Sequence, residues 1–167
     1  DTISGSSADV AAAYAANTAG TISGLGNETV SITGTDATVA NVAAINGATT
    51  GTVTVAEVDV TAGTFSLADL GALTGITGLT TVDATKASLD TQMTITAADL
   101  FAVNDSLGNI TLTINADAAK DTLNLAGWAK GATASGYDSY SISGNFDGVA
   151  GNEIYTVKVT TGVVVTA

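Results

Sequence analysis

The sequence predicts an α/β fold in which coils of strand, turn, strand and short helix repeat as a solenoid that ends in a β-rich C-terminal cap. Two observations predict it. A pentapeptide that begins with Ser or Thr recurs four times at a nearly constant spacing, and each copy opens an apolar pattern of helical period. Thr- and Val-rich runs lie between the copies. A unit of about thirty residues cannot bury its apolar face alone, so we expect successive units to stack. A compact α/β domain with crossover helices is the alternative architecture.

The recurring pentapeptides supply the predicted helix starts. They are SSADV, TDATV, SLADL and TAADL, which begin at Ser6, Thr35, Ser66 and Thr96. In three of the four an Asp follows three residues after the hydroxyl, which resembles a capping box with Asp in place of Glu or Gln. The third helix is the weakest, because interior glycines such as Gly71 and Gly75 each cost about 1 kcal/mol relative to alanine.

Paired strand-like runs separate the predicted helices. They cover residues 21–23 and 29–33, 52–55 and 57–60, 80–83 and 93–96, and 109–115. In the last run Ile110, Leu112 and Ile114 alternate with threonines, which is the pattern of a half-buried strand. Residues 1–115 are therefore predicted to form a four-coil α/β solenoid.

Residues 116–167 are predicted to form a β-rich cap or assembly region, because the pentapeptide pattern stops there. The single tryptophan and three of the four tyrosines fall in this part of the chain. Clustered aromatic side chains often close a core. If Trp128, Tyr137 and Tyr140 were exposed, they would instead form a ligand-binding platform for a glycan. Residues 154–159 and 162–167 are predicted to pair as a hairpin, with 163–165 either a buried strand or an exposed edge.

Composition excludes several classes of function. The chain holds 4 Lys against 16 acids, for a net charge of −12, and it has no Arg, His, Cys or Pro. Without Cys or His it lacks the ligands of a structural zinc site and the usual bases of nucleophilic catalysis. Without Arg and at this charge it is poorly suited to neutralise nucleic-acid phosphates. We therefore predict neither an enzyme nor a nucleic-acid-binding protein.

Two groups of oxygen-bearing side chains are candidate calcium sites, because calcium takes six to eight oxygen ligands from loops. The first group is Asn145, Asp147, Asn152 and Glu153. The second group is Asn104, Asp105, Asp117 and Asp121, with Asn109 nearby in the sequence. For both groups the alternative is an ordinary polar turn, in which Asn and Asp are common.

The capped Ala-rich repeats and the tail DTLNLAGW…GYDSYSISG…YTVKVTTGVVVTA resemble the repeat region and C-terminal part of secreted bacterial surface proteins. These are calcium-associated, type I secreted adhesins and S-layer-like proteins. The resemblance implies an extracellular or cell-surface location, calcium, and attachment or assembly at the surface. The calcium-binding nonapeptide GGxGxDxUx is not present in the chain, so a calcium β-roll is not implied.

The expected function is a secreted structural module of a bacterial cell-surface or extracellular assembly, such as an S-layer, a fibre or an adhesin. We expect calcium to assist self-assembly, and we expect the partners to be copies of the chain or other surface proteins. A glycan- or surface-binding adhesin module is the alternative. Thr-x-Thr pairs occur at 33–35, 52–54, 94–96 and 111–113, and they make an ice-binding solenoid a third hypothesis. No apolar run approaches the length of a transmembrane segment.

Overall fold

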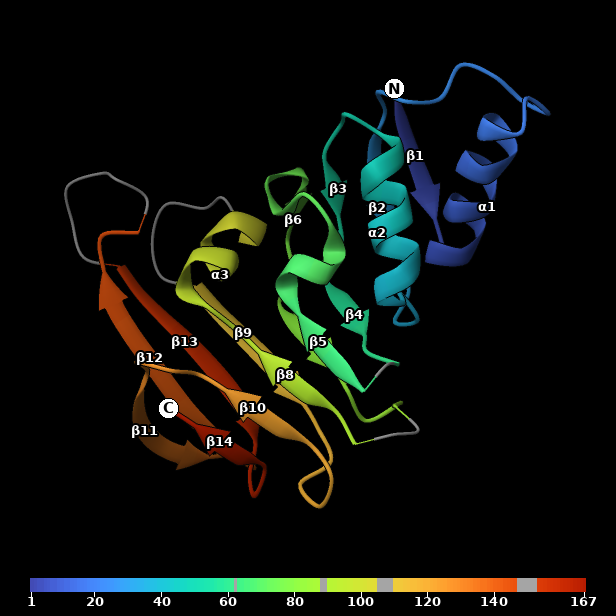
Figure 1. Cartoon of the computed structure of the whole chain (residues 1–167). Helices are drawn as coiled ribbons and strands as arrows, with labels where there is room; N and C mark the ends of the chain where they lie inside the picture. The colour runs from blue at the N-terminus through green and yellow to red at the C-terminus, as the bar shows by residue number, and fades with distance from the viewer. Residues whose placement is uncertain (62, 88–89, 105–109, 147–152) are drawn as a thin grey trace.

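Three β-sheets and three α-helices form the part of the chain that the computed structural model describes (Figure 1). That part comprises residues 1–61, 63–87, 90–104, 110–146 and 153–167. Two sheets are wholly parallel, and the third is mixed. Most strands are only two to four residues long. Strands this short are stable only when neighbours share a buried face.

The first sheet has four parallel strands. They are β1 (Thr2–Gly5), β2 (Thr29–Ile32), β3 (Val53–Thr54) and β6 (Ile76–Thr77), in that order. Its register places Ile3, Val30, Val53 and Ile76 in one row that faces the core. The neighbouring row points outward and carries only hydroxyl side chains, because successive residues of a strand face opposite sides of the sheet.

The second sheet is also parallel and four-stranded. It comprises β5 (Thr64–Ser66), β8 (Gln92–Thr94), β10 (Thr122–Asn124) and β14 (Val164–Thr166), with β5 and β14 at its edges. Phe65, Met93 and Leu123 are buried side by side on its inner face, and Val165 packs against the same core.

The third sheet has six strands. In spatial order they are β4 (Glu57–Asp59), β7 (Thr81–Asp83), β9 (Ile110–Asn115), β13 (Glu153–Thr160), β12 (Tyr137–Gly144) and β11 (Ala129–Ala134). The pairs from β4 to β13 are parallel, whereas β13, β12 and β11 are antiparallel. The sheet therefore joins the two predicted parts of the chain, because β9 pairs directly with β13. The domain boundary at residue 115 stays a prediction.

Helix capping explains where two of the helices begin. The Ser6 hydroxyl accepts a hydrogen bond from the Asp9 amide at 3.2 Å at the start of α1 (Ser7–Thr18). The Thr96 hydroxyl accepts one from the Asp99 amide at 3.1 Å at the start of α3 (Ala97–Asn104). Both starts agree with the sequence pattern, since a side-chain acceptor at N-cap satisfies a free first-turn amide.

The other two predicted helices differ from the structure. α2 (Val39–Ala48) begins three residues later than predicted, because Thr38 rather than Thr35 caps it and accepts from the Asn41 amide at 3.3 Å. The third helix is replaced by the short 3₁₀ turns η1 (Leu67–Leu70) and η2 (Leu73–Gly75). Gly71, which follows η1, has a φ of 89°, a left-handed conformation that ends a helix and that glycine adopts without strain.

The helices pack as a layer over the inner faces of the sheets, with α1 against α2 and α2 against η1 (Figure 1). The side chains of Val42, Ile45, Leu100 and Val103 are fully buried between them and the strands. In the C-terminal part, the Tyr155 ring is fully buried and stacks on Phe146 at a centroid distance of 4.5 Å.

The predicted solenoid of strand-turn-strand-helix coils is wrong. The successive units are unequal: β1 and β2 are each followed by a helix with no further strand, whereas β3, β4 and β5, one in each sheet, all precede η1. Paired residues of parallel strands also lie at unequal separations along the chain, from Val30 with Val53 to Ile110 with Tyr155. A constant repeat would give a constant separation, so the four similar pentapeptides mark local helix caps rather than equivalent coils.

The predicted C-terminal hairpin is also wrong. β14 does not pair with β13 but runs parallel to β10 in the second sheet. The turn at residues 161–162 does not determine which sheet the following strand joins. β14 pairs with β10 because Val165 extends the apolar inner row of the second sheet. Val163 is buried in the core, whereas Val164 is 63% exposed at the sheet edge.

Shortening Leu112, which is fully buried in the middle of β9, is predicted to destabilise the fold strongly. For Leu112→Ala we expect a loss of about 2–5 kcal/mol in the free energy of unfolding, because the cavity is lined by packed side chains that cannot collapse fully. The exposed neighbour Thr111 provides the control, for which alanine should cost about 1 kcal/mol or less. Urea denaturation followed by circular dichroism measures both, and equal losses would contradict the assigned register.

Candidate functional site

Three carboxylates gather on the outer face of the third sheet. Glu57 and Asp59 lie on β4, and Asp83 lies opposite Asp59 on β7. One ligand oxygen from each of the three falls within 4.8 Å of the others, which makes this the group of acids in the described part of the chain that could hold a metal ion. Parallel register creates the cluster, since it aligns the end of β4 with the end of β7.

Lys86 partly neutralises this cluster. Its Nζ lies 2.9 and 2.8 Å from the two carboxylate oxygens of Asp59 and 3.9 Å from Asp83, and it donates to the Thr35 carbonyl at 2.8 Å. The hydrogen bond to Asp59 raises the pKa of Lys86 above its ordinary value. The Asp59 side chain is only 5% exposed, so it needs a cation beside it.

The donor set of this cluster suits a hard divalent cation. Carboxylate oxygens and a backbone carbonyl such as that of Thr35 are the ligands that calcium prefers. A cation bound between the carboxylates of Asp59 and Asp83 would compete with the Lys86 ammonium, because both positive charges occupy the same side of the carboxylates. Sequence analysis missed the cluster, although both strands end in the dipeptide Val-Asp, at 58–59 and 82–83. That recurrence was the available signal.

The first predicted calcium group is only partly described. Glu153 is buried at the start of β13, and its Oε2 accepts a hydrogen bond from the Phe146 amide at 2.9 Å. Asn145 is exposed. Asp147 and Asn152 lie outside the described residues. The contact of Glu153 is the kind that fastens a strand end to its loop, and calcium binding by this group stays a prediction.

In the second predicted group, the two described carboxylates bind backbone amides. Asp121 is 2% exposed, and its two oxygens accept from the amides of Thr91 at 2.9 Å and Asp117 at 2.7 Å. The Ala119 amide donates to Asp117 and thereby lowers the pKa of that carboxyl, with Lys120 adding to the effect. Asn104 ends α3, and Asp105 and Asn109 lie outside the described residues. Asp121 therefore joins the turn before β10 to the start of β8.

The aromatic residues do not form an open platform. Trp128 and Tyr140 are 4% and 5% exposed and belong to the core. Tyr137 is half-buried, and its hydroxyl donates to Oδ1 of Asn115 at 2.8 Å. A stacking site for a sugar ring needs an exposed aromatic face, so these three residues give the glycan hypothesis no support.

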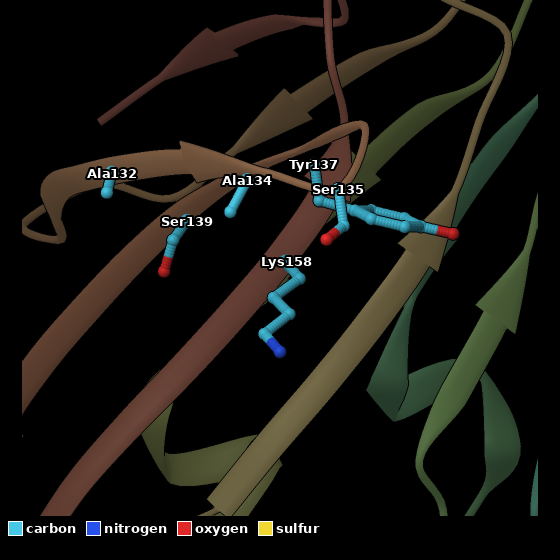
Figure 2. Close-up of a pocket in the computed structure, with 6 residues that line it drawn as sticks. All are labelled: Ala132, Ala134, Ser135, Tyr137, Ser139 and Lys158. Atoms are coloured by element: carbon cyan, nitrogen blue, oxygen red, sulfur yellow. The ribbon is translucent and has the colours of Figure 1, made fainter.

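A small cavity of about 120 Å³ lies beside Lys158 on the outer face of the third sheet (Figure 2). It is lined by Ala132, Ala134, Ser135, Tyr137, Ser139 and Lys158. Ser139 pairs with Lys158 in the register, so their side chains share one face of the sheet. Among the described residues, the ion pairs of lysine involve Lys86, Lys120 and Lys130 but not Lys158. The cavity thus presents an amino group and hydroxyls to an incoming acceptor.

Replacing Lys86 by methionine is predicted to tighten calcium binding at the carboxylate cluster. The Lys86 ammonium repels a cation bound by the same carboxylates, so its removal should lower the dissociation constant for calcium about tenfold. Isothermal titration calorimetry with calcium chloride measures it. Lys120→Met, which removes an exposed lysine from another carboxylate, is the matched control. Equal affinities in Lys86→Met and wild type would contradict a site at this cluster.

No protein-family model, curated protein or solved structure matches this chain. In the described ranges, none of the helices has the length and hydropathy that crossing a bilayer requires.

Proposed function

We propose that this chain is a structural module of a secreted bacterial cell-surface or extracellular assembly, which associates with copies of itself with the help of calcium. The observation that carries the proposal is the cluster of Glu57, Asp59 and Asp83 on an outer sheet face, where Lys86 is the one lysine that contacts it among the described residues. A cation bound there would neutralise part of the negative charge, which otherwise repels the same surface of a second copy.

The overall charge of the chain supports a role for divalent cations. At −12, two copies repel each other at low ionic strength, which keeps free subunits soluble. Association requires that this repulsion be screened or neutralised locally. A divalent ion bound by carboxylates neutralises charge at one place, whereas monovalent salt screens the whole surface. The two mechanisms can therefore be distinguished by experiment.

The sheet edges also support self-association. β1 ends the first sheet and β14 ends the second, and neither has a strand partner on its outer side among the described residues. A free edge presents backbone amide and carbonyl groups that another chain can pair with. Val164 on β14 leaves 63% of its surface exposed, which adds an apolar contact at that edge.

Calcium is predicted to increase the mass of the protein particles in solution, whereas sodium at equal ionic strength is not. Static light scattering of the whole chain, first in excess calcium chloride and then after excess EGTA, measures the effect. The double substitution Glu57→Gln with Asp83→Asn should abolish it, because the cluster loses two of its three charges. Asp1→Asn with Asp90→Asn makes the same change in net charge at exposed positions and should leave it intact. Calcium-independent mass in all variants would contradict the proposal.

A second candidate, ice binding, is favoured by one specific observation. The outer face of the second sheet carries two aligned rows of uncharged side chains. The rows are Thr64, Gln92, Thr122, Val164 and Ser66, Thr94, Asn124, Thr166. All but Ser66 are exposed. Neighbouring strands are about 4.8 Å apart and alternate residues about 6.6 Å apart, so the hydroxyl, amide and methyl groups form a regularly spaced array that can order water.

If this array binds ice, a bulky charge in its centre should remove the activity. We predict that Thr94→Lys abolishes the thermal hysteresis of the wild-type chain, because Thr94 lies inside one row with neighbours on both sides. Thr21→Lys, at an exposed bend outside the sheets, is the matched control and should retain it. Nanolitre osmometry measures both. A wild-type chain without hysteresis or recrystallisation inhibition would remove this candidate and leave the structural role.

A further inference from the structure

On the outer face of the third sheet, one row of side chains carries opposite charges on the two outermost of its parallel strands, β13 and β4, and continues on β12 with Ser139. Following the register from β13 through β9 and β7 to β4, the row reads Lys158, Thr113, Thr81 and Glu57. The two central residues are identical. When these four residues face the same four in reverse order, each Lys lies opposite a Glu and each Thr lies opposite a Thr. The four residues are therefore complementary to a second copy of themselves.

The next row on the same face has a similar property. It reads Asn115, Asp83 and Asp59 on β9, β7 and β4. Reversal about the midpoint between β9 and β7 places the Asn115 amide opposite an Asp83 carboxylate. The Asn115 carbonyl oxygen already accepts from the Tyr137 hydroxyl, which leaves the amide nitrogen as the group that can donate to a carboxylate.

We propose that this face binds the same face of a second copy, related by a two-fold axis that runs parallel to the strands between β9 and β7. Lys158 of each copy then meets Glu57 of the other, and Thr113 of each meets Thr81 of the other. Such an isologous interface requires a self-complementary surface, which the reversed row provides. The inference rests on the proposed self-association and specifies the surface that performs it.

The distribution of charge on this face favours a second copy over other occupants. Lys158 is exposed and takes part in no ion pair of the described residues, although the chain has four times as many acids as lysines. The cavity beside it offers the hydroxyls of Ser135 and Ser139 to an acceptor. Glu57 is half-exposed at the opposite end of the row, where the excess of negative charge lies. Lys158 of one copy therefore complements Glu57 of the other copy in charge.

Geometry permits the contact, and energetics predict that it is weak. Packed sheets lie about 10 Å apart, a gap that long Lys and Glu side chains span while threonines fill the centre. Exposed ion pairs contribute about 0–1 kcal/mol each, so the two pairs set the register and specificity of the contact more than its affinity. Calcium bound between the carboxylates of Asp59 and Asp83 would reduce the remaining repulsion between the two acidic patches and leave Glu57 to Lys158 of the other copy.

A charge-swap experiment tests the interface. Sedimentation equilibrium of the whole chain in low-salt buffer is carried out twice, with EGTA and with calcium. Lys158→Glu and Glu57→Lys should each raise the dissociation constant at least about tenfold, because each places like charges opposite each other twice. In EGTA the double variant should return to within about threefold of wild type, since every charge contact is restored with reversed sign. Calcium should not strengthen its association, because Glu57→Lys removes a carboxylate of the cluster. Lys120→Glu, at an exposed lysine away from this face, is the control and should change little.

Cross-linking gives a second readout that does not depend on the charges. The chain has no cysteine, so single substitutions are unambiguous. In a mixture of Thr113→Cys and Thr81→Cys chains, a short bismaleimide cross-linker should join the two kinds of chain faster than it joins either kind to itself, because it can span the gap between packed sheets. Thr21→Cys chains should cross-link at the slow rate of random collision.

The outcomes separate this interface from the proposed function. Self-association that neither charge variant weakens, or cross-linking without the preference for mixed pairs, overturns the interface while the structural role stands. A chain that stays monomeric at all concentrations, with and without calcium, overturns both. Loss in the single variants with recovery in the double variant, both measured in EGTA, supports the interface. A calcium-dependent gain in mass of the wild-type chain supports the proposed function. Circular dichroism melting checks that all variants are folded.

Discussion

Alignment of apolar side chains across short parallel strands is the interaction on which the rest of this structure depends. Strands of two to four residues cannot hold a sheet together alone, so the row formed by Ile3, Val30, Val53 and Ile76 must pack against the helix layer to keep its strands paired. A slip of one residue would turn each of these side chains to solvent. The buried rows therefore fix the register, and the register fixes every outward row.

The outward rows carry the chemistry as a consequence. Asp59 and Asp83 become neighbours because Val58 and Val82 are buried side by side. The register of the same sheet places Lys158 and Glu57 in one row. In the second sheet, the buried row of Phe65, Met93 and Leu123 likewise fixes the outward rows of uncharged side chains. Lys86 offsets part of the negative charge that register alone creates, by contacting Asp59 and the Thr35 carbonyl together. The negative charge on this face is thus concentrated where a cation could bind or a second copy could form ion pairs.

The C-terminal fifty residues contribute to the sheets rather than capping them from outside. β13 extends the six-stranded sheet from β9, and both β10 and β14 add to the second sheet. The aromatic residues that suggested a platform fill the interior instead, where Trp128 and Tyr140 are buried and Tyr155 stacks on Phe146. The shared sheets bury one continuous core.

The sequence by itself determined the local features of this protein. The helix starts after Ser6 and Thr96, the alternating strand at 110–115 and the apolar alternation at 154–159 all follow from side-chain capping and period-two burial, which depend on neighbours in the chain. Only the tertiary structure decided which strands are adjacent, that β14 joins β10, and that Glu57, Asp59 and Asp83 meet. Parallel pairing links residues 23 to 45 positions apart, and nothing local specifies that separation, because it is chosen by how the buried rows pack together.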